Sequence, residues 1–146
     1  MFSLRNCGLA RMELGGENLA AAKDDLLEVL ARRRELLAGE RNQMRVAETQ
    51  VDLSNVCLRM GDAQEALGYA QDAERTFLES FDDVESAKRS FASCYVAIAE
   101  ALISLARTDE ARERLQRAVE LYEQVLGADS THQHLLHTRV LLDHCQ

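Results

Sequence analysis

The fold is decided by residues 50–77, which read QVDLSNVCLRMGDAQEALGYAQDAERTF. Before the Gly61-Asp62 pair, successive residues of one set lie three or four positions apart: Gln50, Leu53, Cys57 and Met60. A second set with the same kind of spacing follows the pair: Ala66, Ala70, Ala73 and Phe77. Side chains three and four residues apart lie on one face of an α-helix. The stretch therefore predicts two amphipathic helices joined by a tight turn.

Working outward, the same small-residue spacing occurs three times, at steps of 46 and 45 residues. The members are Cys7, Gly8, Gly15, Ala20 and Leu27 in the first copy, Leu53, Ser54, Gly61, Ala66 and Ala73 in the second, and Ile98, Ala99, Ala106, Ala111 and Ala118 in the third. Small side chains let two helix backbones approach closely. We expect the second member of each copy to face the fourth across a helical hairpin, and the fifth to let the next hairpin dock.

This pattern resembles the tetratricopeptide repeat over about residues 1–126, most strongly over 47–120. The usual period is about 34 residues, and the longer period here is similar to that of kinesin light chain, nephrocystin-type and Pins-like repeats. The resemblance implies an all-α fold of tandem antiparallel hairpins in a right-handed superhelix.

We expect one helical repeat domain over residues 1–146, with repeats at about 1–46, 47–91 and 92–130 and a terminal helix at 131–145. The extra residues of each period should lengthen the helices. Repeat arrays usually begin and end with polar caps, which are not evident here, so we expect the chain to be a segment of a longer protein.

Several details of the helix ends follow from residue type. Thr108 or Asp109 is the expected N-cap of the last hairpin's second helix, and Gly127 is expected to end that helix. In the terminal helix, four apolar residues are expected to cover the end of the stack: Leu135, Leu136, Val140 and Leu141.

Composition narrows the class of function. The net charge is −8 and the middle third is the most acidic, which argues against nucleic-acid or anionic-membrane binding. The longest uncharged stretch, Ser90 to Ala99, is too short to span a bilayer. Four scattered cysteines without a CxxC pair are typical of reduced thiols in a cytoplasmic protein.

No pattern of side chains predicts an enzyme, a cofactor site or a metal site. The cysteines have no histidine before His132 to act as a base, and Gly15-Gly16 lacks a phosphate-loop pattern. The four late histidines match no zinc-ligand spacing: His132, His134, His137 and His144. A basic cluster is interpreted as a solvated helix flank: Arg32, Arg33, Arg34, Arg41 and Arg45.

The resemblance places a partner-binding surface on the first helix of each repeat, along the concave face. Its positions are Arg5, Leu9, Met12, Val51, Asn55, Leu58, Val96, Glu100 and Ile103. Glu100 would repel a C-terminal carboxylate, which excludes the clamp of co-chaperone repeats. We expect an adaptor or scaffold that binds a peptide or amphipathic helix of another protein. The alternative is a purely structural segment that self-associates through its exposed terminal helices.

Overall fold

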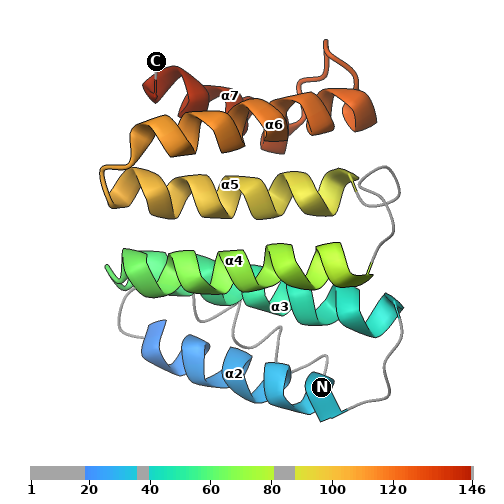
Figure 1. The fold of residues 1–146 in the computed structure, drawn as a ribbon, viewed down its shortest axis with the longest axis vertical. Helices are drawn as coiled ribbons and strands as arrows, with labels where there is room; N and C mark the ends of the chain where they lie inside the picture. The colour runs from blue at the N-terminus through green and yellow to red at the C-terminus, as the bar shows by residue number, and fades with distance from the viewer. Residues whose placement is uncertain (1–18, 36–39, 81–87, 146) are drawn as a thin grey trace.

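The computed structural model describes residues 19–35, 40–80 and 88–145. These residues are almost entirely helical and contain no strand, as the sequence predicts. The helices are α2 (Leu19–Glu35), α3 (Glu40–Arg59), α4 (Ala63–Ser80), α5 (Lys88–Ser104), α6 (Thr108–Leu126) and α7 (Gln133–His144). Figure 1 shows them stacked in chain order, from α2 at one end to α6 and α7 at the other. The pairs α3–α4 and α5–α6 form the two described hairpins.

The first helix of each hairpin begins earlier than the expected repeat limits at 47 and 92. α3 begins at Glu40 and α5 at Lys88. The residues beyond a standard repeat therefore lengthen the first helices as well as the second ones.

Small side chains hold the two helices of each hairpin close together. Ser54 Oγ on α3 donates to the carbonyl oxygen of Ala66 on α4 at 2.7 Å. Ala66 is fully buried, and so are Ala99 and Ala111 in the next hairpin. The Ser54–Ala66 contact confirms the prediction for the second copy, and in the third both small residues are buried. In the first copy Gly8 lies outside the described residues, and the prediction is wrong for Ala20, which is exposed because α2 turns other residues toward the core.

The two hairpin turns have the same hydrogen-bond pattern at the same repeat positions. The bonds run from Gly61 N–H to Leu58 O (3.1 Å) and Asp62 N–H to Cys57 O (2.9 Å) in one turn, and from Ala106 N–H to Ile103 O (3.0 Å) and Arg107 N–H to Leu102 O (2.8 Å) in the other. This paired arrangement satisfies carbonyl groups at a helix C-terminus and requires a left-handed residue. That residue is Gly61, with φ of 85°, and Ala106, with φ of 62°.

The helices differ in how they begin and end. Asp62 Oδ1 accepts from the Glu65 N–H at 3.0 Å and so caps α4. Arg107 precedes α6 without a side-chain cap bond, so the N-cap predicted at Thr108 or Asp109 is wrong, because Thr108 is already helical. Gly127 ends α6 as predicted, with φ of 93°.

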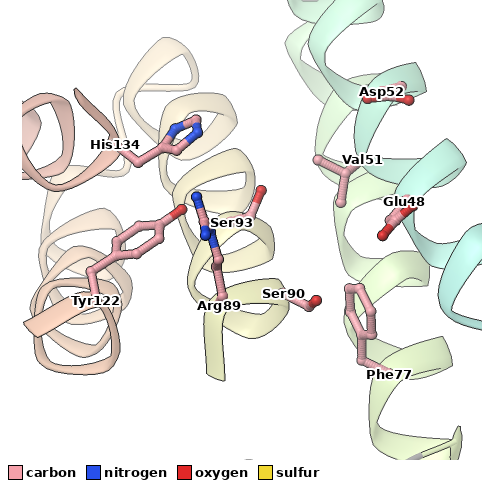
Figure 2. A pocket seen from close by; sticks show the side chains of 9 residues that line it. All are labelled: Glu48, Val51, Asp52, Phe77, Arg89, Ser90, Ser93, Tyr122 and His134. Atoms are coloured by element: carbon pink, nitrogen blue, oxygen red, sulfur yellow. The ribbon is translucent and has the colours of Figure 1, made fainter. Parts of the chain in front are cut away.

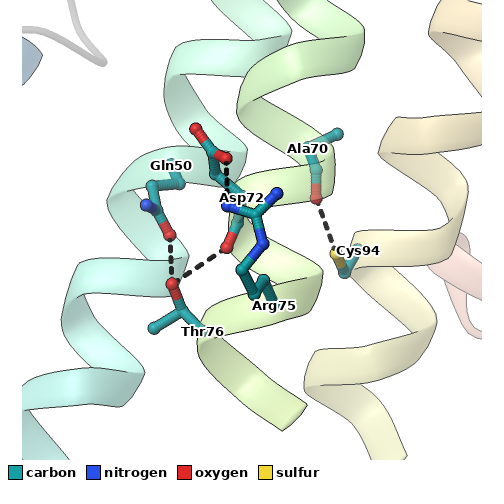
Figure 3. Close-up of polar contacts among 6 residues, drawn as sticks. All are labelled: Gln50, Ala70, Asp72, Arg75, Thr76 and Cys94. Atoms are coloured by element: carbon teal, nitrogen blue, oxygen red, sulfur yellow. Dashed lines mark hydrogen bonds and ion pairs between the residues drawn. The ribbon is translucent and has the colours of Figure 1, made fainter. Parts of the chain in front are cut away.

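Successive hairpins are joined by apolar and sulfur contacts between α4 and α5. The rings of Phe77 and Phe91 lie 5.5 Å apart. The Cys94 thiol, which is fully buried, donates to the Ala70 carbonyl at 3.3 Å (Figure 3). Burial raises the pKa of Cys94 to about 12, so this thiol acts as a packing group with a weak donor.

Ion pairs also connect the second helices of neighbouring hairpins. Lys23 on α2 contacts Glu65 on α4 at 2.6 Å. Arg114 on α6 pairs with Glu74 on α4, and its guanidinium lies 5.3 Å from the centre of the Tyr95 ring. Interactions of charged side chains, as well as apolar packing, therefore hold α2, α4 and α6 together in the stack.

One member of the basic cluster is not solvated, contrary to the prediction. Arg33 is 3% exposed, and its Nη1 donates to the Arg45 carbonyl at 2.9 Å and to Thr49 Oγ1 at 3.1 Å. It joins α2 to α3. The side chain of Arg41 lies outside the described residues, and three members are exposed as predicted: Arg32, Arg34 and Arg45.

The terminal helix covers the stack with fewer residues than predicted. Leu135 is fully buried and Leu141 is half-buried, but Leu136 is 45% exposed and Val140 is 53% exposed. The prediction is wrong for these two because α7 lies with Leu135 and Thr138 against the stack, which turns Leu136 and Val140 outward.

The left-handed turn residue gives the first testable prediction. Left-handed backbone costs an L-residue with a β-carbon about 1 kcal/mol. We expect Ala106→Gly to raise the free energy of unfolding by up to about 1 kcal/mol, and Gly61→Ala to lower it similarly. Nothing lies within 4 Å of a β-carbon at Gly61, so the effect there is one of backbone strain. Urea unfolding followed by circular dichroism measures both changes in the free energy of unfolding. The control is Ala31→Gly at an exposed helical position, which should destabilise the protein.

The close helix crossing gives the second prediction. A leucine at position 66 would separate α3 from α4 and break the Ser54 contact, so Ala66→Leu should lower the free energy of unfolding by about 1–3 kcal/mol. The control is Ala31→Leu at an exposed site on α2, where we expect a change within about 0.5 kcal/mol. Equal urea midpoints for the two variants would contradict the close crossing.

Candidate functional site

A groove opens between α3, α5 and α7. It consists of two adjoining pockets of about 250 and 150 Å³. Both pockets are lined by four of the same residues: Val51, Ser93, Tyr122 and His134. Figure 2 shows the larger pocket, with Tyr122 and His134 on one side and the residues of α3 across the gap. The two pockets therefore form one continuous groove.

Helix α5 supplies the floor of the groove. Arg89, Ser93, Ala97 and Glu100 line it, at intervals of four, four and three residues. This spacing places them on one face of the helix. Arg89 thus lies at one end of the floor and Glu100 at the other, with Ser93 between them.

Helices α3 and α7 supply the walls. Four residues of α3 line the groove at intervals of three, one and three residues: Glu48, Val51, Asp52 and Asn55. On α7 the lining residues are His134, His137 and Thr138. Phe77 of α4 also lines the larger pocket (Figure 2). Side chains from both described hairpins and from α7 therefore meet at one surface.

The predicted partner-binding residues fall into three groups. Val51, Asn55, Val96 and Glu100 line the smaller pocket. Two others, Leu58 and Ile103, are half-buried against the main core cluster and line neither pocket. The three from the first repeat lie outside the described residues: Arg5, Leu9 and Met12.

Other lining residues were not among the predicted set. Arg89 and Ser93 extend the helical stripe of Val96 and Glu100 toward the start of α5, so continuing that stripe would have found them. The sequence presents the α7 residues only as a histidine cluster. His132 accepts the His134 N–H through Nδ1 at 3.2 Å and caps α7, which turns His134 toward the groove.

An aromatic and basic group occupies the α5–α7 side of the larger pocket. The rings of Tyr122 and His134 stack with centres 6.2 Å apart, and the Tyr122 hydroxyl bonds with Ser93. Burial raises the pKa of Tyr122, while the neighbouring Arg89 opposes that rise. Burial, then the His132 ring, lowers the pKa of His134, which favours its neutral form.

The smaller pocket contains a partly buried carboxylate. The Glu100 side chain is 29% exposed, and its Oε1 lies 3.7 Å from Nε2 of His137, beyond hydrogen-bond distance. Burial raises the pKa of Glu100, and His137 and Arg59 oppose that rise. The carboxylate is thus held where neither water nor a protein cation solvates it fully.

Two other kinds of feature are absent from the part of the chain that the structure describes. Within the described ranges, no three His, Cys, Asp or Glu side chains gather as metal ligands would. None of the described helices combines the length and apolarity required to cross a membrane.

The raised pKa of Glu100 gives a prediction about pH. Between the usual value of 4.5 and its raised value, the folded chain binds the proton more readily than the unfolded chain. The free energy of unfolding therefore falls as pH rises through that interval. We expect Glu100→Gln to be more stable than wild type at pH 7, with the gain vanishing below pH 4.5, in urea titrations at each pH. A less stable variant at pH 7 would mean that attraction to His137 and Arg59 outweighs burial.

Comparison with known proteins identifies the repeat. A family model described as tetratricopeptide repeat matches residues 91–132, which cover nearly all of α5, all of α6 and the connection to α7. No curated protein matches the chain. Repeats of this family generally act as protein-interaction modules. Residues 91–132 of this chain are therefore similar to a tetratricopeptide repeat.

Proposed function

We propose that this chain is an adaptor that binds a peptide segment of a partner protein in the groove between α3, α5 and α7. The observation that carries the proposal is the groove itself, which side chains of two hairpins and of α7 line together. Repeat proteins use such shared surfaces to hold extended or helical segments. A cytoplasmic location fits the free, buried thiols of Cys57, Cys94 and Cys145.

The lining of the groove suits a ligand with an apolar anchor. Its apolar lining residues are Val51, Phe77, Val96, Ala97 and Tyr122, of which Val51 and Val96 are each 9% exposed. Polar and charged side chains line the rest of the groove and provide hydrogen bonds that would fix the register of the ligand. Apolar contact combined with orienting polar groups is typical of peptide and small-ligand sites.

Ser93 is the best position for a test, because it is exposed and lines both pockets. Arginine at Val51 or Val96 would disturb the core, whereas Ser93→Tyr should fill the groove and leave the hairpin folded. Its matched control is Gln71→Tyr, which alters an exposed residue of α4 outside the groove.

The measurement is selection of a displayed random-peptide library on the wild-type chain, followed by titration of selected peptides against both variants. We expect Ser93→Tyr to weaken binding by roughly tenfold or more, as loss of a central anchor does, and Gln71→Tyr to leave it unchanged. Circular dichroism must show equal helicity. Peptides that bind both variants equally would place the binding surface elsewhere.

The alternative function is a structural or self-associating role. Leu136 and Val140 favour it, because these two apolar side chains lie four residues apart on α7 and are both exposed. A library selection that retains no peptide would favour this alternative.

A further inference from the structure

The groove carries an excess of negative charge. Three carboxylates line it, from Glu48, Asp52 and Glu100, against one guanidinium, from Arg89. The carboxylates of Glu48 and Asp52 lie on the α3 wall, and Arg89 lies across the gap beside Tyr122 (Figure 2). An acidic ligand entering along α3 would meet like charge, whereas a basic ligand would meet complementary charge.

Glu100 is the carboxylate of the smaller pocket. It lies partly buried at the end of the smaller pocket, 3.7 Å from an imidazole nitrogen that is charged only when protonated. A carboxylate removed from water is stabilised best by a charge-assisted hydrogen bond. Asn55 lines the same pocket and carries an amide group. A guanidinium or ammonium group would complement the carboxylate and could also donate to an amide oxygen.

The two pockets together define the distance between two contact points for a ligand. Ser90 lines the larger pocket and Glu100 the smaller one, ten residues apart on α5. At 1.5 Å per residue this separation is about 15 Å, which four or five residues of an extended chain would span. Phe77 lines only the larger pocket, at the Ser90 end, and Tyr122 lines both pockets.

We propose that the groove selects a peptide segment that carries an apolar side chain and, about four or five residues away, an arginine or lysine. The apolar side chain enters the larger pocket, and the cation binds Glu100 and Asn55. This inference rests on the proposed function, because it specifies which partner segment the same groove accepts.

The test uses the same displayed random-peptide library, selected in parallel on wild type, Glu100→Gln and Glu100→Arg. Glutamine keeps the shape of the side chain and removes its charge, and arginine reverses the charge. Glu113→Gln is the control, since Glu113 is an exposed carboxylate of α6 outside the groove. Circular dichroism and urea midpoints establish that each variant is folded.

On wild type and on Glu113→Gln, we expect the selected peptides to carry a basic residue more often than an acidic one at a fixed distance from an apolar residue. Glu100→Gln should lose that bias and bind wild-type-selected peptides roughly tenfold more weakly, and Glu100→Arg should enrich acidic residues instead. Selected peptides without a basic preference, or a preference that survives Glu100→Gln, would overturn this inference. If Ser93→Tyr still abolished the binding of such peptides, the proposed function would hold without the preference for a basic residue. Selection of no peptide would overturn both.

Discussion

The close approach of paired helix backbones is the constraint on which the remaining structure depends. Where α3 and α4 cross, Ser54 bonds to the Ala66 carbonyl and both residues are buried, so a larger side chain there would separate the helices. The burial of Ala99 and Ala111 indicates the same limit in the next hairpin. Because each hairpin is narrow, its outer faces lie near enough for the next pair to dock through Ala73, Phe77 and Phe91. Helix spacing, and with it the width of the groove, follows from these small residues.

The same helices serve the core and the groove with different faces. On α5, Phe91, Cys94 and Ile98 pack inside the stack, while Ser93 and Glu100 face the groove. Core packing therefore positions the groove side chains, and contacts such as the Tyr122–His134 stack add to it. Ser93 is exposed in the groove, and the partly buried Glu100 lies near His137, which opposes the effect of burial on its pKa. Binding groups held in this way need little reordering when a ligand arrives.

The periodicity of the sequence predicts much of this arrangement, but it does not predict how the stack of hairpins curves. The spacing of small residues predicts the hairpins and their turn, and helical phase brings Val51, Asn55, Val96 and Glu100 to one pocket. The α7 wall depends on how sharply successive hairpins rotate, which many small packing contacts decide together. The burial of Arg33 likewise depends on the docking of α2, since its partners belong to α3. The local sequence pattern predicts neither the rotation between successive hairpins nor the docking of α2.

The position of α7 has a consequence for cooperativity. Each unit of a helical stack contacts chiefly its neighbours, so such arrays unfold almost as a one-dimensional chain of nearest-neighbour couplings. The groove departs from that scheme, because α3 and α7 belong to different units separated by α5 and yet face the same space. An occupant touching both walls adds a next-nearest-neighbour coupling. Occupancy would then convert a stack that frays from its ends into one that opens as a whole.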